Sequence, residues 1–136
     1  MSAASLRDAS VQEIQLELIR RTRFNTFDGE AVVAKLLQYR ALWLAVLLDR
    51  PGVPDRHEWG LPTAGLIKLR DLPQNVWNAD TLFVLTDGHE KARQFVRAFE
   101  AEEWGGMVQV YDDTEMIDRA LGTGRKEYGI VTVWWD

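Results

Sequence analysis

The chain has 136 residues, enough for one domain with its own hydrophobic core, and 46% hydrophobic against 27% charged residues excludes a disordered tail. It contains no cysteine, which excludes disulfides, thiolate catalysis and cysteine-ligated metals. The formal net charge of -5 repels phosphate backbones, so nucleic acid is disfavoured as a partner.

The first predicted element is a helix over about 10–23. Ser10 and Glu13 have the spacing of a capping box, and the apolar residues Val11, Ile14 and Leu18 follow with helical spacing. We expect residues 1–9, which precede this helix, to be disordered. They carry no basic and apolar signal pattern, so we expect a cytoplasmic location.

A second helix is predicted over 30–48. Asp28 is a candidate N-cap, and the segment after it begins amphipathic and becomes apolar on all sides. We therefore expect 10–48 to be helical. The apolar run ALWLAVLL at 41–48 is far shorter than the roughly 20 residues of a bilayer span, so we expect no membrane association.

Residues 49–65 are predicted to form a long loop, because three of the four prolines and three glycines lie there. The next segment, LIKLR at 66–70, alternates between apolar and basic residues. This alternation is typical of a short strand, and Lys68 and Arg70 favour a position at the edge of a sheet.

Strands and helices alternate in the C-terminal half. We predict strands at 82–85, 107–111 and 130–135, with helices at 88–104 and 114–121 between them. This alternation favours βαβ crossovers and a parallel sheet, in which the apolar run 82–85 is central and the strand order is 2-1-3. The predicted fold is a single α/β domain, with two N-terminal helices packed on a small, mainly parallel sheet formed by 66–136.

Acidic residues follow the ends of all three predicted strands. Asp87 follows the first, Asp112 and Asp113 follow the second, and Asp136 follows the third. Parallel strands direct their carboxyl ends to one edge, so the acids are expected to meet there. Converging carboxylates repel one another unless a cation lies between them, and Mg²⁺ prefers oxygen ligands. Asp87, Asp112 and Asp113 are therefore candidate magnesium ligands.

The same acids also have a structural interpretation. Asp87 precedes Glu90 by three residues, and Asp112 precedes Glu115 with the same spacing. Aspartate is a favoured N-cap, and acids in the first helical turn interact favourably with the helix dipole. Helix capping explains each acid without a ligand, and we favour it over the metal site.

Two further groups of residues are candidates for binding. His57 and Trp59 lie in the predicted long loop, and such loops often carry function. Trp134 and Trp135 are adjacent on a strand, so their side chains must point to opposite faces of the sheet. Trp135 and Asp136 are candidate binding residues at the acidic edge.

The leading hypothesis is a non-catalytic binding module without a cofactor, whose acidic strand-end edge and nearby aromatics contact a protein partner or a second copy of the chain. The alternative is a magnesium-dependent phosphoryl-transfer or hydrolytic enzyme with Asp87, His89 and Asp112 as catalytic candidates, His89 being a general base. A small-molecule pocket between the N-terminal helices and the sheet is a third hypothesis.

Overall fold

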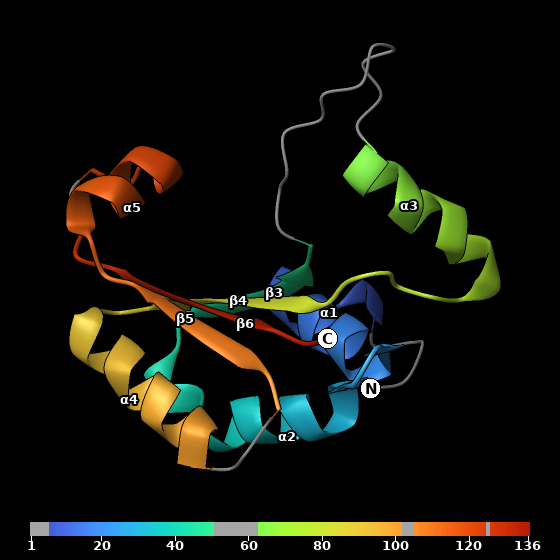
Figure 1. The fold of residues 1–136 in the computed structure, drawn as a ribbon, viewed down its shortest axis with the longest axis horizontal. Coiled ribbons are helices and arrows are strands. Elements are labelled where there is room, and N and C mark those ends of the chain that lie inside the picture. Colours follow the sequence, from blue (N-terminus) through green and yellow to red (C-terminus); the bar gives the residue numbers. More distant parts are fainter. Residues whose placement is uncertain (1–5, 51–62, 102–104, 125) are drawn as a thin grey trace.

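The structure is a computed structural model that describes residues 6–50, 63–101, 105–124 and 126–136 (Figure 1). The candidate binding residues His57 and Trp59 lie outside the described residues, as do most of the predicted loop and residues 1–5. In the part of the chain that is described, no helix combines the length and the apolar character needed to cross a bilayer.

The elements follow one another in this order: α1 (Val11–Arg21), β1 (Arg23–Phe24), β2 (Phe27–Asp28), α2 (Gly29–Gln38), the 3-10 turn η2 (Arg40–Leu42), β3 (Ala45–Asp49), α3 (Thr63–Asp71), the 3-10 turn η3 (Leu72–Gln74), β4 (Thr81–Thr86), α4 (His89–Ala101), β5 (Met107–Tyr111), α5 (Thr114–Leu121) and β6 (Gly129–Trp134). Strands β1 and β2 form a small hairpin. The main sheet has four strands in the order β3-β4-β6-β5.

All neighbouring strands of the main sheet are antiparallel, so the predicted parallel sheet with order 2-1-3 is wrong. Strand β6 lies between β4 and β5 instead of beside β4 alone. The reason lies in α5, whose eight residues span about 12 Å and lie over the end of the sheet where β5 finishes (Figure 1). Strand β6 therefore starts at that end and runs back against β5.

Two segments adopt the opposite structure from the one predicted. Residues 45–48, expected to be the end of a helix, lie in edge strand β3, and 66–70, expected to be an edge strand, lie within helix α3. Both segments are short and largely apolar, and such runs do not distinguish strand from helix by periodicity. The N-terminal part of the chain therefore contributes a strand to the sheet as well as two helices.

Local capping signals are confirmed. Ser10 Oγ accepts a hydrogen bond from Glu13 N at 3.0 Å, and Ser10 N donates to Glu13 Oε1 at 2.9 Å. Asp28 Oδ1 accepts from Ala31 N at 3.4 Å at the start of α2. Gly122, with a φ of 66°, ends α5 in the left-handed conformation that favours glycine.

The hydrophobic core lies between one face of the main sheet and helices α1, α2 and α4. Figure 1 shows α2 and α4 on the same side of the sheet. The strands contribute the alternating buried residues Val46, Leu48, Leu82, Val84, Val131 and Val133. The helices contribute Ile19, Val32, Leu36, Phe95 and Phe99. One face of every long strand is thus committed to the core.

Gly29 allows α2 to start directly against the end of α1. Its N–H donates to Thr22 O at 3.1 Å, and a Cβ atom at this position would meet Ile19 O at 1.9 Å. We expect Gly29→Ala to lower the free energy of unfolding by about 2–3 kcal/mol or more, because the atoms in the way belong to the backbone. Urea denaturation followed by circular dichroism measures this loss.

Gly105→Ala is the matched control. Gly105 has a φ of 73°, and a Cβ there would meet nothing within 4 Å. This variant carries the strain of a left-handed residue without a clash, a cost of about 1–2 kcal/mol. An equal or smaller loss in Gly29→Ala would contradict the steric explanation.

Candidate binding surface

The antiparallel sheet separates the acids that follow its strands. Strands β4 and β5 finish at the same end of the sheet, but β6 lies between them. Asp87 and Asp112 therefore follow strands that are about 9.6 Å apart. Strand β6 finishes at the opposite end of the sheet, which places Asp136 away from both Asp87 and Asp112. The expected meeting of all three strand ends is wrong, because it depended on a parallel sheet.

Asp112 and Asp113 have different surroundings. Asp112 Oδ2 lies 3.7 Å from Arg93 Nη1, and both side chains are about half exposed. Asp113 Oδ1 accepts a hydrogen bond from Met116 N at 3.1 Å and caps α5. The capping interpretation therefore applies one residue later than the Asp112 position that the spacing indicated.

Asp87 and His89 lie at the start of α4. Asp87 is exposed, whereas His89 is half-buried and its Nε2 lies 3.5 Å from Thr114 Oγ1. Among the described residues, no three or more histidine, cysteine, aspartate or glutamate side chains are grouped so that they could hold a metal ion. Magnesium binding and catalysis at this end of the sheet stay predictions.

The two C-terminal tryptophans point to opposite faces, as expected for adjacent strand residues. Trp135 is buried in the core and packs edge-on against Phe27, with ring centroids 4.8 Å apart. Trp134 lies on the other face and is 37% exposed. Asp136 is exposed, and its backbone oxygen accepts from Thr26 N at 3.1 Å. The tryptophan available to a partner is Trp134 rather than Trp135.

The side of the main sheet opposite the core, called the outer face below, carries many large apolar residues. In antiparallel sheets, such a face usually carries polar residues. Large apolar side chains from all four strands occupy it here: Leu47, Phe83, Leu85, Met107, Ile130 and Trp134. Leu47 is 43% exposed and Met107 is 66% exposed. Exposed apolar surface of this kind marks interaction sites.

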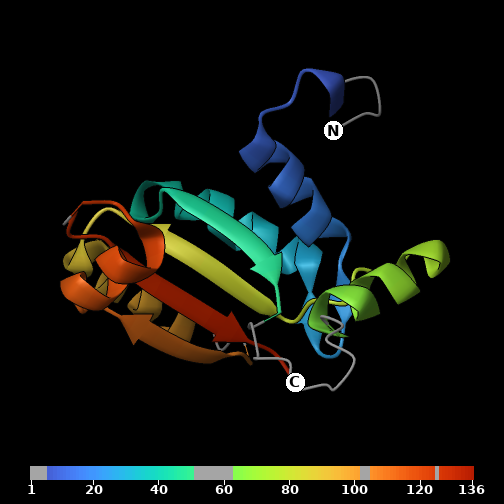
Figure 2. The same ribbon diagram turned by 90° about the horizontal axis from the view of Figure 1, so that it is seen from above.

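Helices cover the outer face only in part. Helix α5 lies over the end of the sheet where β6 begins, and α3 stands beyond the other end (Figures 1 and 2). In both views, no described helix lies over the middle of the strands. The core face carries a layer of helices, and the described part of the chain places no such layer over the middle of the outer face.

Two hollows lie on the outer face. One has a volume of about 460 Å³, with Leu47, Phe83 and Ile130 on its floor and Leu121 of α5 at its side. The other, of about 410 Å³, lies between Phe83, Trp134 and Met107 near strand β5. Phe83 borders both hollows, so the two form neighbouring parts of one surface.

Polar contacts hold α3 at the β3 end of this surface. Lys68 forms an ion pair with Asp49, and its Nζ lies 5.2 Å from the centre of the Trp77 ring. Trp77 Nε1 in turn donates to Leu48 O at 3.2 Å. These contacts give the apolar surface a polar margin beside Asp49.

A second chain of contacts continues this margin. Arg50 Nη1 donates to Asn78 Oδ1 at 2.5 Å, and Asn78 Nδ2 donates to Asp71 Oδ2 at 2.7 Å. Hydrogen bonds from Arg70 and Asn78 hold the pKa of Asp71 at about 2, well below its ordinary value. The segment that leads from α3 into β4 is thereby fixed against the end of β3.

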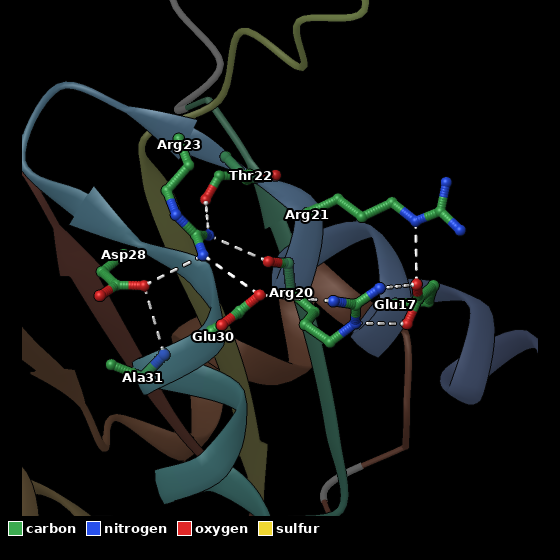
Figure 3. A network of polar contacts seen from close by, with 8 residues as sticks. All are labelled: Glu17, Arg20, Arg21, Thr22, Arg23, Asp28, Glu30 and Ala31. Carbon is green, nitrogen blue, oxygen red and sulfur yellow. Dashed lines mark hydrogen bonds and ion pairs between the residues drawn. The ribbon is translucent and has the colours of Figure 1, made fainter. Parts of the chain in front are cut away.

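The three arginines near the end of α1 form a separate network, shown in Figure 3. Glu17 accepts hydrogen bonds from Arg20 Nε at 2.8 Å and from Arg21 Nε at 2.9 Å. Arg20 Nη1 and Arg23 Nη2 lie 3.6 Å and 3.5 Å from Glu30 Oε1. Carboxylates thus face each guanidinium group.

This arginine network joins three elements. Arg23 also lies 3.5 Å from Asp28, the N-cap of α2, and donates to Arg20 O at 3.0 Å. The network therefore connects the end of α1, the β1–β2 hairpin and the start of α2 (Figure 3). Because carboxylates pair with the arginines, we interpret the cluster as a stabilising contact between these elements and not as an anion-binding site.

Comparison with protein-family models, with curated proteins and with solved structures finds no match to this chain.

The outer face was not identified as a site from the sequence, although a signal for it was present. The run at 82–85 is apolar on both faces, a pattern typical of a strand that is covered on both sides. Helices cover the core side, while no described helix lies over the middle of the outer side. An apolar strand face shows that something covers it, but not whether the cover belongs to the same chain.

The Glu17 contacts predict a pH-dependent contribution to stability. Hydrogen bonds from Arg20 and Arg21 hold the pKa of Glu17 at about 2, below its ordinary value of 4.5. Because the folded-state pKa is depressed, the contribution is complete above about pH 4.5 and is lost as the pH falls toward 2. We expect Glu17→Gln to lower the free energy of unfolding by about 1–2 kcal/mol at pH 7, the exposure of both arginines limiting the effect.

Urea denaturation of wild type and Glu17→Gln at pH 7, 4 and 3 measures this contribution. The difference between the two proteins should shrink as the pH falls. Glu30→Gln, at a side chain that is 64% exposed, should change the free energy of unfolding by less than about 0.5 kcal/mol. A Glu17 effect that is constant with pH would contradict the assignment.

Asp112 and Asp113 provide a test of capping against metal binding. We expect Asp113→Ala to lower stability by about 1 kcal/mol through loss of the α5 cap, and Asp112→Ala to change it by less than about 0.5 kcal/mol. Thermal unfolding with and without excess Mg²⁺ measures both effects. A Tm that rises by several degrees with Mg²⁺ in wild type but not in Asp112→Ala would support the magnesium alternative.

Proposed function

We propose that this protein is a non-catalytic interaction module that presents its outer face to an amphipathic helix of a partner protein. The observation that carries the proposal is the apolar outer face, which is exposed at Leu47, Met107 and Trp134 in a sheet whose other face is fully packed. Burial of this surface by a partner would remove apolar area from water, which is the main driving force of association.

The dimensions of the outer face suit a helix. Four strands at the usual spacing place the axes of β3 and β5 about 14 Å apart, and strands of five or six residues are about 17–20 Å long. A helix is about 10 Å wide, and three to four turns cover this length. Such a helix would supply a layer like that on the core side, at the middle of the outer face where no described helix lies.

Charge favours a partner helix with basic flanks. The protein carries a net charge of -5, and the exposed acids Asp112, Asp113 and Glu115 lie at the α5 end of the surface. Lysine and arginine beside an apolar stripe would be attracted by this field and would speed association. The acids retain a role in recognition under this proposal, at the rim of the surface and not at its centre.

The proposal rests on a different surface from the acidic strand-end edge, because β6 runs antiparallel to its neighbours. Nothing in the described geometry favours the enzyme alternative, in which Asp87, His89 and Asp112 would act together. A cytoplasmic location stays part of the proposal, and fractionation of cells that express a tagged protein tests it.

Titration with a designed helical peptide of leucine and lysine tests the proposed surface. In an NMR titration, we expect the largest amide shifts at the outer-face residues Leu47, Phe83 and Thr132, with a Kd on the order of 100 μM or tighter. Leu47→Glu should weaken binding by at least about tenfold, because it places a charge in the apolar contact.

Two controls make the result specific. Leu37→Glu changes an exposed leucine of α2, which belongs to the helical layer on the opposite side of the sheet, and should leave the Kd within about twofold. A matched peptide of leucine and glutamate should bind more weakly, and the difference should diminish at high salt. Shifts that map away from the outer face, or equal effects of the two glutamate variants, would rule out the proposed surface.

A further inference from the structure

The two edge strands of the main sheet are protected differently. At β3, the Gln12 side chain donates from Nε2 to Val46 O and accepts at Oε1 from Val46 N, both at 2.9 Å. Leu48 O accepts from Trp77 Nε1 at 3.2 Å. Side chains therefore occupy backbone groups that a further strand would need, and the β3 edge is closed to pairing.

The β5 edge has backbone groups that point outward. Hydrogen-bonded pairs alternate along an antiparallel ladder, and Trp135 N donates to Asp80 O at 3.0 Å. This bond directs the odd-numbered residues of β6 toward β4 and the even-numbered residues toward β5. Val108 and Val110 lie opposite odd-numbered residues of β6. Their N–H and C=O groups consequently point to the free edge.

No described group bonds to these outward positions. The hydrogen bonds found among the described residues include none from outside the sheet to the backbone of β5, and Figure 2 shows no described helix or strand beyond β5 in the plane of the sheet. The strand MVQVY contains no charge and no proline, the residues by which edge strands usually resist pairing.

We propose that β5 pairs with β5 of a second copy of this chain, antiparallel and about a twofold axis at Gln109. In this register, Val108 of each copy lies opposite Val110 of the other, and each such pair exchanges both backbone hydrogen bonds. The two four-stranded sheets then form one continuous sheet of eight strands. Other registers shorten the overlap of the two strands, or place backbone groups that point to the free edge in one copy opposite groups that are already bonded to β6 in the other.

The side chains of β5 match in this register. Val108 and Val110 both lie on the core face, and Met107 and Tyr111 both lie on the outer face, so apolar residues oppose apolar residues across the axis. Because β5 is uncharged, no like charges face each other along the paired strands. The central contact is between the two Gln109 side chains.

The flanks beneath the strand are also compatible with the pairing. Helix α4 packs under β5, and its side toward the end of β5 carries Arg93 and Glu90, since Arg93 Nε lies 3.5 Å from Glu90 Oε2 and Arg93 Nη1 lies 3.7 Å from Asp112 Oδ2. Arg97 Nη2 lies 3.3 Å from Glu90. This flank carries both signs of charge, so two copies of it meet without a surplus of one sign.

The pairing goes beyond the proposed function, because it uses an edge and not the outer face. It would place two outer faces side by side on one extended sheet and leave each open to its own partner helix. Failure of helix binding would leave the pairing unaffected, and the reverse also holds.

Charge variants at Gln109 test the pairing, since this residue is exposed and faces itself across the axis. We expect analytical ultracentrifugation of the wild type over roughly 1 μM to 1 mM to show a monomer–dimer equilibrium. Gln109→Glu and Gln109→Lys should each weaken dimerisation by about tenfold or more, because like charges meet at the axis. An equimolar mixture of the two variants should restore the dimer, since unlike charges then meet.

Val110→Pro provides a second, independent variant. It removes an N–H that points to the free edge and is not used by β6, so it should abolish the dimer while circular dichroism shows a folded protein. Leu47→Glu, on the outer face at the far side of the sheet, should leave dimerisation unchanged. A wild type that is monomeric throughout, a dimer that persists in Val110→Pro, or a mixture that fails to restore association would each overturn the proposal.

Discussion

Strand β6 hydrogen-bonds to β4 on one side and to β5 on the other, and runs antiparallel to both. Most other features of the molecule depend on this position. Because Val131 and Val133 of β6 are fully buried, the strand also forms the centre of the core face. Its direction places Asp136 at one end of the sheet and the acids that follow β4 and β5 at the other. A shared carboxylate edge, such as parallel strands produce, is therefore not formed by all three strands.

The edge strands show how the same sheet is closed on one side and open on the other. Gln12 covers the backbone of Val46 with an amide that both donates and accepts, which imitates one residue of a neighbouring strand. No described residue covers the outward backbone groups of β5 in this way, and the strand contains no charged residue. Exposed strand edges promote association, so a natural protein that leaves one unprotected has a reason to use it. This contrast between two edges of one sheet is the basis for the proposed pairing.

Charge and apolar surface have separate roles in the fold. Arginines and acids at the end of α1 form local ion pairs that join three elements, while the excess acids are dispersed over the surface and produce its negative field. Apolar residues on the outer face contribute little to the core, because three of them stay substantially exposed. This is the apolar area that the proposed partner helix would remove from water.

The sequence by itself determined the features that depend on neighbours a few residues apart. Ser10 and Asp28 cap helices as expected, because a cap needs only a side chain within one turn. The strand at 107–111 and the helix at 114–121 were also predictable, because their apolar periodicity is clear. Acid spacing located the cap of α5 to within one residue, at Asp113 rather than Asp112.

Tertiary structure decided everything that depends on distant partners. Residues 45–49 form a strand because β4 offers them a ladder, and 66–70 join a helix although their pattern suits a strand. The direction of β6 follows from the position of α5 at the end of the sheet where β5 finishes. No local sequence pattern predicts that position. For the same reason, the acids did not reveal the candidate site. The same alternation of apolar residues suits a strand face that its own chain covers and a strand face that a partner covers. Which of the two applies is therefore a property of the assembled sheet.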